Sequence, residues 1–324
     1  MTFYNERSLI TESIASILRQ SFDDFELIIV EDGSPDDTAK FVDQFEDPRI
    51  VRICQANDGL SSARNRGLAH ARGEFVCFLD ADDSRPSWAF AAIAAAIERS
   101  DADIYLCRGQ LSEVRGNLLP FYDEQYFETI RRDWPVDRRL GTLSFAEQDE
   151  LFALAHLIEP QSANKVVRRS LLQDHKIQFP NGHFFEDMFF HNACLVAAES
   201  IDFVDDICFT YYRRYAKKQI TAGTGDMRID SLAVAKLTLE HFAKSLHFNS
   251  PLRRTALLVA AMRITSWCEE TIAHSYRPYF RQLQTALFDL IDSNYRSLPS
   301  KLPHFFASSS RHLDYAISHF QHKA

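Results

Sequence analysis

Two clusters of acidic side chains each follow a short apolar run. Glu31 and Asp32 come directly after the run at 25–30, and the sequence Asp-Ala-Asp-Asp at 80–83 follows the run at 74–79. In an open α/β sheet, ligands bind beyond the carboxyl ends of the strands. Carboxylates crowded at such ends repel one another, and a cation or ligand relieves that repulsion. Either cluster alone is explained by a solvated turn, in which Asp is common. Two clusters in one strand–helix series favour a site.

The chemistry of these clusters points to a divalent cation. Clustered carboxylate oxygens are the ligands that Mg²⁺ and Mn²⁺ prefer, and such a cation neutralises a departing diphosphate. The sequence contains neither G-x-G-x-x-G nor G-x-x-x-x-G-K-[ST], so it lacks both Gly-rich phosphate loops. We therefore expect a diphosphate to be held by the cation and by Arg64 or Arg66. The alternative for these two Arg residues is a solvated helix face.

Strand and helix patterns alternate through the first hundred residues. Short apolar runs predict strands at 25–30, 49–53, 74–79 and 103–107. Periodic apolar positions and helix-starting residues predict helices at 7–20, 34–45, 61–71 and 86–99. This alternation predicts an α/β fold with a Rossmann-like, mostly parallel sheet and helices on both faces.

The remainder of the chain is organised differently. Residues from about 110 to 230 are less regular and rich in aromatic side chains. Three helical patterns follow, at 231–248, 252–270 and 278–291. We therefore predict three parts: 1–110, 111–228 and a C-terminal helical region at 229–324.

Bulk properties exclude some classes of function. The 324 residues carry a formal net charge of −9, so a nucleic-acid partner has no electrostatic support. The chain has no apolar run of about 18 residues, and its start lacks the layout of a signal peptide. Six scattered Cys residues form no C-x-x-C pair, and Cys54, Cys77 and Cys107 are expected to be buried reduced thiols. Together these features predict a cytoplasmic protein.

Four segments resemble, in their order along the chain, the sequence signatures of a known enzyme family. They are FYNE (3–6), QSFDDFELIIVEDGSPDDT (20–38), NDGLSSARNRGLAHARGEFVCFLDADD (57–83) and FPNGHFFEDMFF (179–190). Over about residues 2 to 221 the chain resembles glycosyltransferase family 2, whose members have the GT-A fold. The resemblance implies an inverting enzyme that uses Mn²⁺ or Mg²⁺. It would move a hexosyl or N-acetylhexosaminyl unit from a nucleotide diphosphate sugar, a UDP-sugar, to a saccharide hydroxyl in polysaccharide or glycan synthesis. Residues 1–110 would bind the donor, and 111–228 would bind the acceptor and supply the catalytic base.

The resemblance assigns nucleotide binding to five residues. Tyr4 matches the aromatic residue that stacks on the base, and Glu6 closes the same FYNE signature. Asp32 matches an acid that accepts a hydrogen bond from uracil, as a carboxylate can. Arg64 matches a residue near the diphosphate, and Asp80 matches the first acid of the D-x-D motif, which contacts the ribose.

The metal and the catalytic base are assigned in the same way. Asp82, the second acid of D-x-D, matches the metal ligand, with Asp83 as an additional candidate. Asp187 matches the general base of inverting members, which takes the proton from the acceptor hydroxyl, and Glu186 is an additional candidate. Without the upstream motifs, Glu186 and Asp187 would be explained as acids favoured by a helix N-terminus.

Two features depart from the family pattern. Members begin with a strand such as V-S-V-I-I-P before this signature, whereas here the chain begins at Met1, so we expect the true start to lie upstream. Some members also supply a His ligand to the metal within a segment like 210–221, where this chain has none. Water and phosphate oxygens would complete the metal shell, and Arg213 or Arg214 would contact the diphosphate.

Two other functions stay open at this stage. A sugar-1-phosphate nucleotidyltransferase uses a related sheet but needs a Gly-rich phosphate loop near its N-terminus. A catalytically inactive sugar-nucleotide-binding scaffold would not need Asp32, Asp82 and Asp187. The C-terminal helices could cover the core, pair subunits or rest on a membrane. By analogy with bacterial relatives, we expect a saccharide or lipid-linked saccharide acceptor and peripheral contact with the inner face of the plasma membrane. The oligomeric state, the sugar and the linkage stay open.

Overall fold

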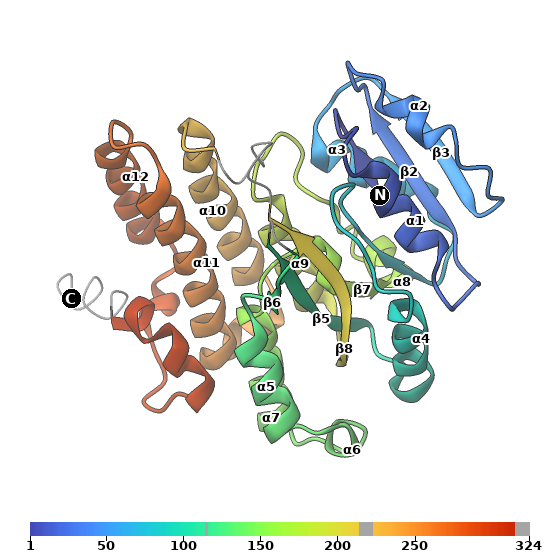
Figure 1. Cartoon of the computed structure of the whole chain (residues 1–324). Coiled ribbons are helices and arrows are strands. Elements are labelled where there is room, and N and C mark those ends of the chain that lie inside the picture. The colour runs from blue at the N-terminus through green and yellow to red at the C-terminus, as the bar shows by residue number, and fades with distance from the viewer. Residues whose placement is uncertain (114–115, 214–222, 315–324) are drawn as a thin grey trace. The chain divides into compact units, whose positions relative to one another are not determined.

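A computed structural model describes residues 1–113, 116–213 and 223–314, and these form two compact units (Figure 1). The first unit comprises Met1–Phe127, Gln161–Gly182 and the described residues from Ala197 to Arg213. The second unit comprises Glu128–Pro160, His183–Val196 and the described residues from 223 to 314. The chain therefore passes between the two units several times.

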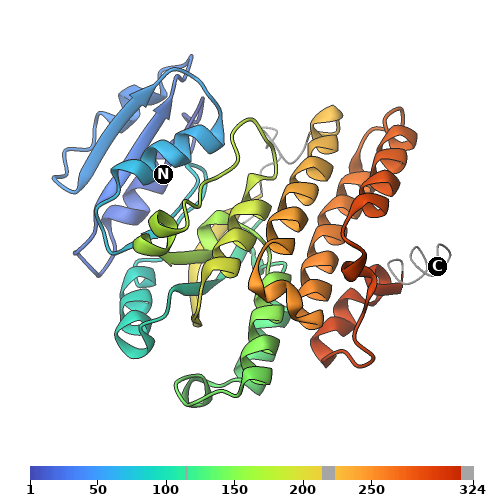
Figure 2. The ribbon, with the colours of Figure 1, turned by 180° about the vertical axis from the view of Figure 1, so that it is seen from behind.

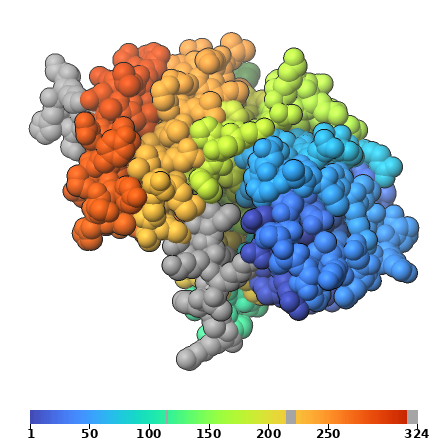
Figure 3. Space-filling model, turned by 90° about the horizontal axis from the view of Figure 1, so that it is seen from above, coloured from blue at the N-terminus to red at the C-terminus, as the bar shows by residue number. Residues whose placement is uncertain are grey.

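The first unit begins with a parallel sheet in the order β1-β2-β3. Its strands are β1 (Thr2–Phe3), β2 (Leu27–Asp32) and β3 (Ile50–Gln55). Its helices are α1 (Ile10–Leu18), α2 (Thr38–Val42) and α3 (Leu60–His70). The apolar positions of α1 are buried against this sheet, as their helical spacing predicts. The blue atoms of this segment form one continuous surface in Figure 3.

One prediction for this sheet is wrong. Cys54 is exposed, although an apolar strand was expected to bury it. Successive side chains of a strand point to opposite faces of the sheet, and on β3 the exposed ones, Arg52 and Cys54, share one face. The Cys54 thiol donates a hydrogen bond to Glu31 Oε2 over 3.4 Å.

A second sheet in the same unit has the order β4-β7-β5-β6, with β8 paired to β5. Its strands are β4 (Phe75–Cys77), β5 (Ile104–Ser112), β6 (Leu118–Pro120), β7 (Lys165–Arg168) and β8 (Ile201–Tyr212). Strands β5 and β8 run parallel and side by side, whereas β7 lies antiparallel between β4 and β5 (Figure 1). The helix α4 (Ala89–Ser100) packs its apolar face on β8, and α8 (Arg169–Asp174) follows β7.

The β5–β8 pair contains a tightly packed glycine. Gly109 pairs with Phe209 beside an irregular register, and a Cβ at Gly109 would lie 2.1 Å from the Phe209 ring. We expect Gly109→Ala to lower the free energy of unfolding by about 1–3 kcal/mol, because overpacking forces this buried ring to move. Thermal or urea unfolding measures the change. Gly225→Ala is the control, since its Cβ meets nothing within 4 Å and its φ is −80°. Equal stability of the two variants would contradict the prediction.

The second unit is helical in its described residues apart from loops. Its main helices are α7 (Phe145–Leu157), α9 (Glu186–Ala197), α10 (Asp230–Ala243), α11 (Pro251–Thr271) and α12 (Arg277–Leu290). The helix α5 (Glu124–Asp133) spans the boundary between the units, and α6 (Val136–Arg139) is a single turn. Helices α10, α11 and α12 lie side by side and confirm the three predicted C-terminal helices (Figure 2).

One apolar core joins α9 to the three C-terminal helices, with Met188 as the buried contribution of α9. Among the described residues, no helix combines the length and apolar character needed to cross a membrane.

Candidate active site

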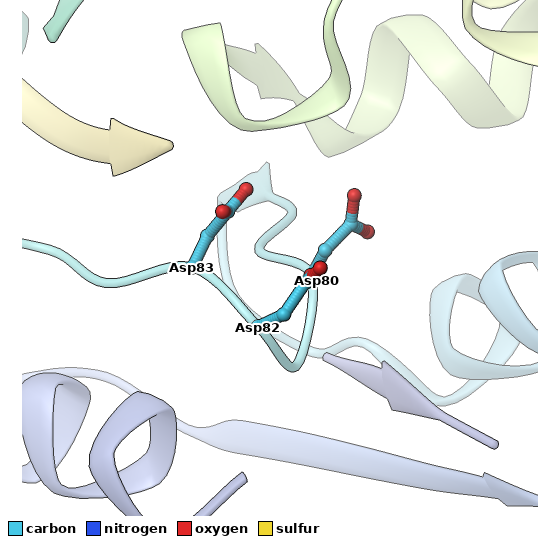
Figure 4. Close-up of side chains that lie close together, drawn as sticks. All are labelled: Asp80, Asp82 and Asp83. Carbon is cyan, nitrogen blue, oxygen red and sulfur yellow. The ribbon is translucent and has the colours of Figure 1, made fainter. Parts of the chain in front are cut away.

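Asp80, Asp82 and Asp83 lie on one loop after β4, and each offers a carboxylate oxygen within 4.8 Å of the others (Figure 4). Bridge pairings fix both ends of this loop. Asp80 pairs with Thr2 of β1, and Ser84 pairs with Thr210 of β8. The acidic cluster predicted from sequence is therefore formed by one turn whose ends are held by strands.

Asp83 is the buried member of the cluster. Its side chain is fully buried, and Oδ1 accepts a hydrogen bond from the Tyr212 N–H over 3.1 Å. Burial, together with the negative charge of Asp80, raises the pKa of Asp83 well above its ordinary value. Among the described residues, Oδ2 has no hydrogen-bond partner. A buried oxygen without a partner, next to two more carboxylates, fits the hard-cation ligand set expected here.

Arg64 contacts the cluster from α3. Its Nη2 lies 2.7 Å from Asp80 Oδ1, and its side chain is 2% exposed against 30% for Asp80. The guanidinium also lies over the Phe179 ring, 5.0 Å from the centroid. The structure thus brings together two residues that were assigned separately to the nucleotide. A buried guanidinium pointing at a half-exposed carboxylate places a positive charge at the rim of the acidic loop.

Arg85, which the sequence analysis did not single out, anchors the same loop. Its buried guanidinium donates to the carbonyl oxygens of Phe78, Ala163 and Cys208 at 2.9–3.0 Å. It therefore ties the acidic loop to β8 and to the residues before β7. Its position two residues after the acidic cluster was the only signal that the sequence offered.

Asp32 lies at the end of β2 and is 4% exposed. Its carboxylate accepts hydrogen bonds from the backbone N–H groups of Asp58 and Gly59 at 2.9 and 3.0 Å, and from Gln55 Nε2 at 2.8 Å. Asp32 therefore organises the loop that begins α3. Its contact with a base stays a prediction.

The loop after Asp32 needs a glycine. Gly33 has φ +64°, and a Cβ there would lie 2.6 Å from the backbone nitrogen of Asn57. Next to it, an open hollow of about 570 Å³ is lined by Asn57, Asp58, Asn65 and Arg66 among others. Arg66, one of the two predicted phosphate-binding Arg residues, therefore faces this hollow.

Tyr4 and Glu6 follow β1. Tyr4 is 50% exposed, as a stacking platform must be. The Glu6 N–H donates to Thr38 Oγ1 at 3.1 Å, and Glu6 Oε1 accepts from Ser8 Oγ at 3.1 Å. These contacts hold the FYNE signature against the start of α2.

Arg213 directly follows β8 and is the neighbour of Tyr212, whose N–H donates to Asp83 of the acidic loop. Its Nε donates to the Tyr122 hydroxyl at 3.1 Å, and its Nη1 lies 3.5 Å from Glu113 Oε1. Arg214 lies outside the described residues. The predicted contact of either residue with a diphosphate stays a prediction.

Glu186 and Asp187 form the first turn of α9, in the second unit. Glu186 is 6% exposed, and Asp187 is partly buried. The body of α9 is fixed from within the unit, because Met188 enters the apolar core and Asn192 bonds to His156 of α7 at 2.8 Å. The role of Asp187 as base, and its convergence with Asp32 and Asp82, stay predictions.

His156 makes this helix contact sensitive to acid. Asn192 Nδ2 donates to the Met188 carbonyl, so its Oδ1 accepts from His156 Nδ1, and the ring is neutral with an unprotonated Nε2. Burial lowers the pKa of His156 to about 3, against an ordinary value of 6.5. Between these values the unfolded chain binds the proton and the folded chain does not, so stability falls as the pH falls.

We expect the titration of His156 alone to lower the free energy of unfolding by about 2 kcal/mol when the pH falls from 7 to 5. Urea unfolding of the wild type and of His156→Gln at both pH values measures this. The Gln variant keeps a donor for Asn192. Between pH 7 and pH 5 its free energy of unfolding should fall by about 2 kcal/mol less than that of the wild type. The same loss in both proteins would show that His156 does not titrate in this way.

The comparisons with known proteins are consistent with this geometry. Residues 1–153 match the family model "Glycosyl transferase family 2". The chain is 42% identical over 106 residues to the uncharacterized glycosyltransferase EpsJ of Bacillus subtilis, covering 32% of this chain and 31% of EpsJ. It is 26% identical to the glycosyltransferase GlyG of Streptococcus pneumoniae, covering 65% of this chain and 68% of GlyG.

The structure can also be compared with a solved one. Poly(ribitol-phosphate) β-N-acetylglucosaminyltransferase TarS of Staphylococcus aureus is 27% identical over 64% of this chain and 34% of its own length. The crystal structure of TarS 1–349 with UDP-GlcNAc matches with a TM-score of 0.72 at 19% identity, over 99% of this chain and 89% of that one. For EpsJ and TarS, the matched sequence spans only about a third of the relative.

Proposed function

Because the chain belongs to glycosyltransferase family 2 and has the GT-A fold, we propose that it is an inverting glycosyltransferase acting in polysaccharide or glycan synthesis. The family and the fold predicted from the four ordered motifs are thereby confirmed. The proposed reaction moves a hexosyl or N-acetylhexosaminyl unit from a UDP-sugar to a saccharide hydroxyl.

The observation that carries this proposal is the acidic loop at 80–83 with Arg64 beside it. Asp82 would be the direct ligand of Mn²⁺ or Mg²⁺, and Asp83 an additional one. When bound, the cation would neutralise the charge that develops on the leaving diphosphate. Asp80 and Arg64 would hold the donor at the ribose and the diphosphate.

The nucleotide would be recognised at the ends of β1 and β2. Tyr4 would stack on the base, Asp32 would accept a hydrogen bond from it, and Glu6 would stabilise the same segment. The crystal structure of TarS with UDP-GlcNAc supports a uridine nucleotide, since TarS shares this fold.

In the proposed chemical step Asp187 is the general base. Its carboxylate takes the proton of the acceptor hydroxyl while that oxygen attacks the anomeric carbon. The bond from this carbon to the diphosphate oxygen breaks, and the diphosphate leaves with the electron pair. Attack from the face opposite the leaving group inverts the anomeric centre.

The acceptor class and the location are proposed by analogy with the relatives. The name of TarS, a poly(ribitol-phosphate) β-N-acetylglucosaminyltransferase, supports transfer of an N-acetylhexosaminyl unit to a polymer. For this chain we propose a saccharide or a lipid-linked saccharide as the acceptor class. Such acceptors are built at the inner face of the plasma membrane, so we propose a cytoplasmic protein with peripheral membrane contact.

A panel of UDP-, GDP- and dTDP-sugars tests the proposal. We expect the full-length protein to release UDP from at least one UDP-sugar with Mn²⁺, and EDTA to stop this release. Tight binding of UDP without turnover, with every acceptor tried, would favour an inactive scaffold. Formation of a nucleotide sugar from a sugar-1-phosphate would favour a nucleotidyltransferase.

A further inference from the structure

The residue directly before α9 adopts a conformation that its type does not favour. Phe185 has φ +64°, in the left-handed region that bulky side chains rarely occupy. Such a conformation persists only where the surrounding structure holds it. This strained residue directly precedes Glu186 and Asp187, which begin α9.

One carboxylate holds the two residues before Phe185. Asp230, the first residue of α10, accepts a hydrogen bond from the Phe184 N–H on Oδ2 at 2.5 Å. Its Oδ1 lies 2.8 Å from His183 Nδ1. Both oxygens of Asp230 are therefore engaged with consecutive residues of the loop, and bonds to an ionised acceptor are stronger than neutral ones.

The Phe185 ring is held by the next helix. It contacts Trp267 of α11 edge-on, with 6.3 Å between centroids, and packs against the apolar core of the unit. Trp267 in turn lies under the Arg228 guanidinium at 4.1 Å, and Arg228 is 3% exposed. The C-terminal helices thus hold this loop from both its polar and its apolar side.

The loop matters for Asp187 because of where Asp187 lies in α9. The first four N–H groups of a helix have no acceptor within the helix, so the first turn is held less firmly by the helix itself and depends in part on the residues that precede it. Met188, in the apolar core, and Asn192, bonded to His156 of α7, anchor the body of α9, but they lie after Asp187. We propose that Asp230 is a positioning residue for Asp187, acting through His183 and Phe184. This inference rests on the proposed function.

Kinetics of the full-length protein test the inference. We expect Asp230→Ala to lower kcat about 10²-fold, the cost of a base misplaced by about 1 Å. The donor KM should stay within about threefold, because the donor is bound elsewhere. Asp230→Asn keeps an acceptor for the Phe184 N–H, so its kcat should be only about tenfold below that of the wild type. Asp226→Ala, an exposed acid four residues earlier, should match the wild type.

A double variant separates positioning from general stability. If Asp230 acts through Asp187, Asp187→Asn with Asp230→Ala should be no slower than Asp187→Asn alone, within about threefold. A further large loss in the double variant would contradict the inference. If Asp230→Ala does not fold, Asp230→Asn and His183→Ala decide, and wild-type kcat in both would overturn it.

The same measurements keep the two proposals apart. No turnover by the wild type with any donor, or full turnover by Asp187→Asn, would contradict the proposed function. Turnover that requires Asp187 and is unaffected by loss of Asp230 would contradict only the inference drawn from the loop.

Discussion

Asp187→Asn is expected to lower kcat for sugar transfer about 10²–10⁴-fold, the usual contribution of a general base. The amide has the shape of the carboxylate but does not accept the proton of the acceptor hydroxyl. The KM for the nucleotide sugar should change little, because the base acts on the acceptor. Steady-state kinetics with the donor and acceptor varied separately measure both effects.

Glu186→Gln is the matched comparison for this variant. It changes the neighbouring carboxyl group in the same first turn of α9, at a side chain that is 6% exposed. We expect it to retain more activity than Asp187→Asn. A larger loss of kcat for Glu186→Gln, with the kcat of Asp187→Asn close to that of the wild type, would make Glu186 the general base and contradict the assignment of Asp187.

Asp82→Ala is expected to lower the rate in saturating Mn²⁺ about 10²–10³-fold, the size of effect seen when one group that stabilises developing charge is removed. The variant leaves Asp80 and Asp83, so weak Mn²⁺ binding should persist. The Mn²⁺ concentration that gives half the maximal rate should therefore rise. Titrating Mn²⁺ in the UDP-release assay, and by calorimetry in the presence of UDP, measures both changes.

An exposed acid provides the control for the metal experiment. Asp24→Ala removes one carboxylate from the surface of the same unit and should leave the Mn²⁺ dependence unchanged. Wild-type activity that survives EDTA, or an Asp82→Ala protein with an unchanged Mn²⁺ titration, would count against a metal at the acidic loop.

The first hundred residues were predictable because each element is encoded locally. The buried strand β2 appears in the sequence as a continuous apolar run, and α1 carries its apolar residues at helical spacing. Each predicted strand and helix is present with ends shifted by a few residues. The acidic cluster followed from these elements, because its residues come directly after the apolar run at 74–79 that contains β4.

The middle of the chain was not predictable in the same way. Strand β7 has four residues, and β8 carries Asp205 and Asp206 in its middle, so neither shows a clear apolar pattern. Both strands are defined by pairing with β5, which is far away in the sequence. Helix α7 did carry a signal that went unused, since Ser144 and Glu147 form a capping box at its start.

In the site, too, residues that are adjacent in sequence were predictable, whereas contacts between residues far apart in sequence were not. Asp80, Asp82 and Asp83 are neighbours in sequence and lie together in the structure. The partners of Asp32 at residues 55–59, and the contact of Asp230 with His183, depend on loops that come together only when the chain folds. A single sequence carries no pattern for such contacts.

The interrupted course of the chain constrains how this protein can be recombined with its relatives. The second unit takes α7 and α9 from the middle of the chain and α10 to α12 from its end, and the packing of α9 depends on those last helices. A chimera joined at a single crossover before α10 would give α9 a foreign partner surface. Exchanging α9 together with α10, α11 and α12 in one step would keep each helix with the neighbours it was selected to fit.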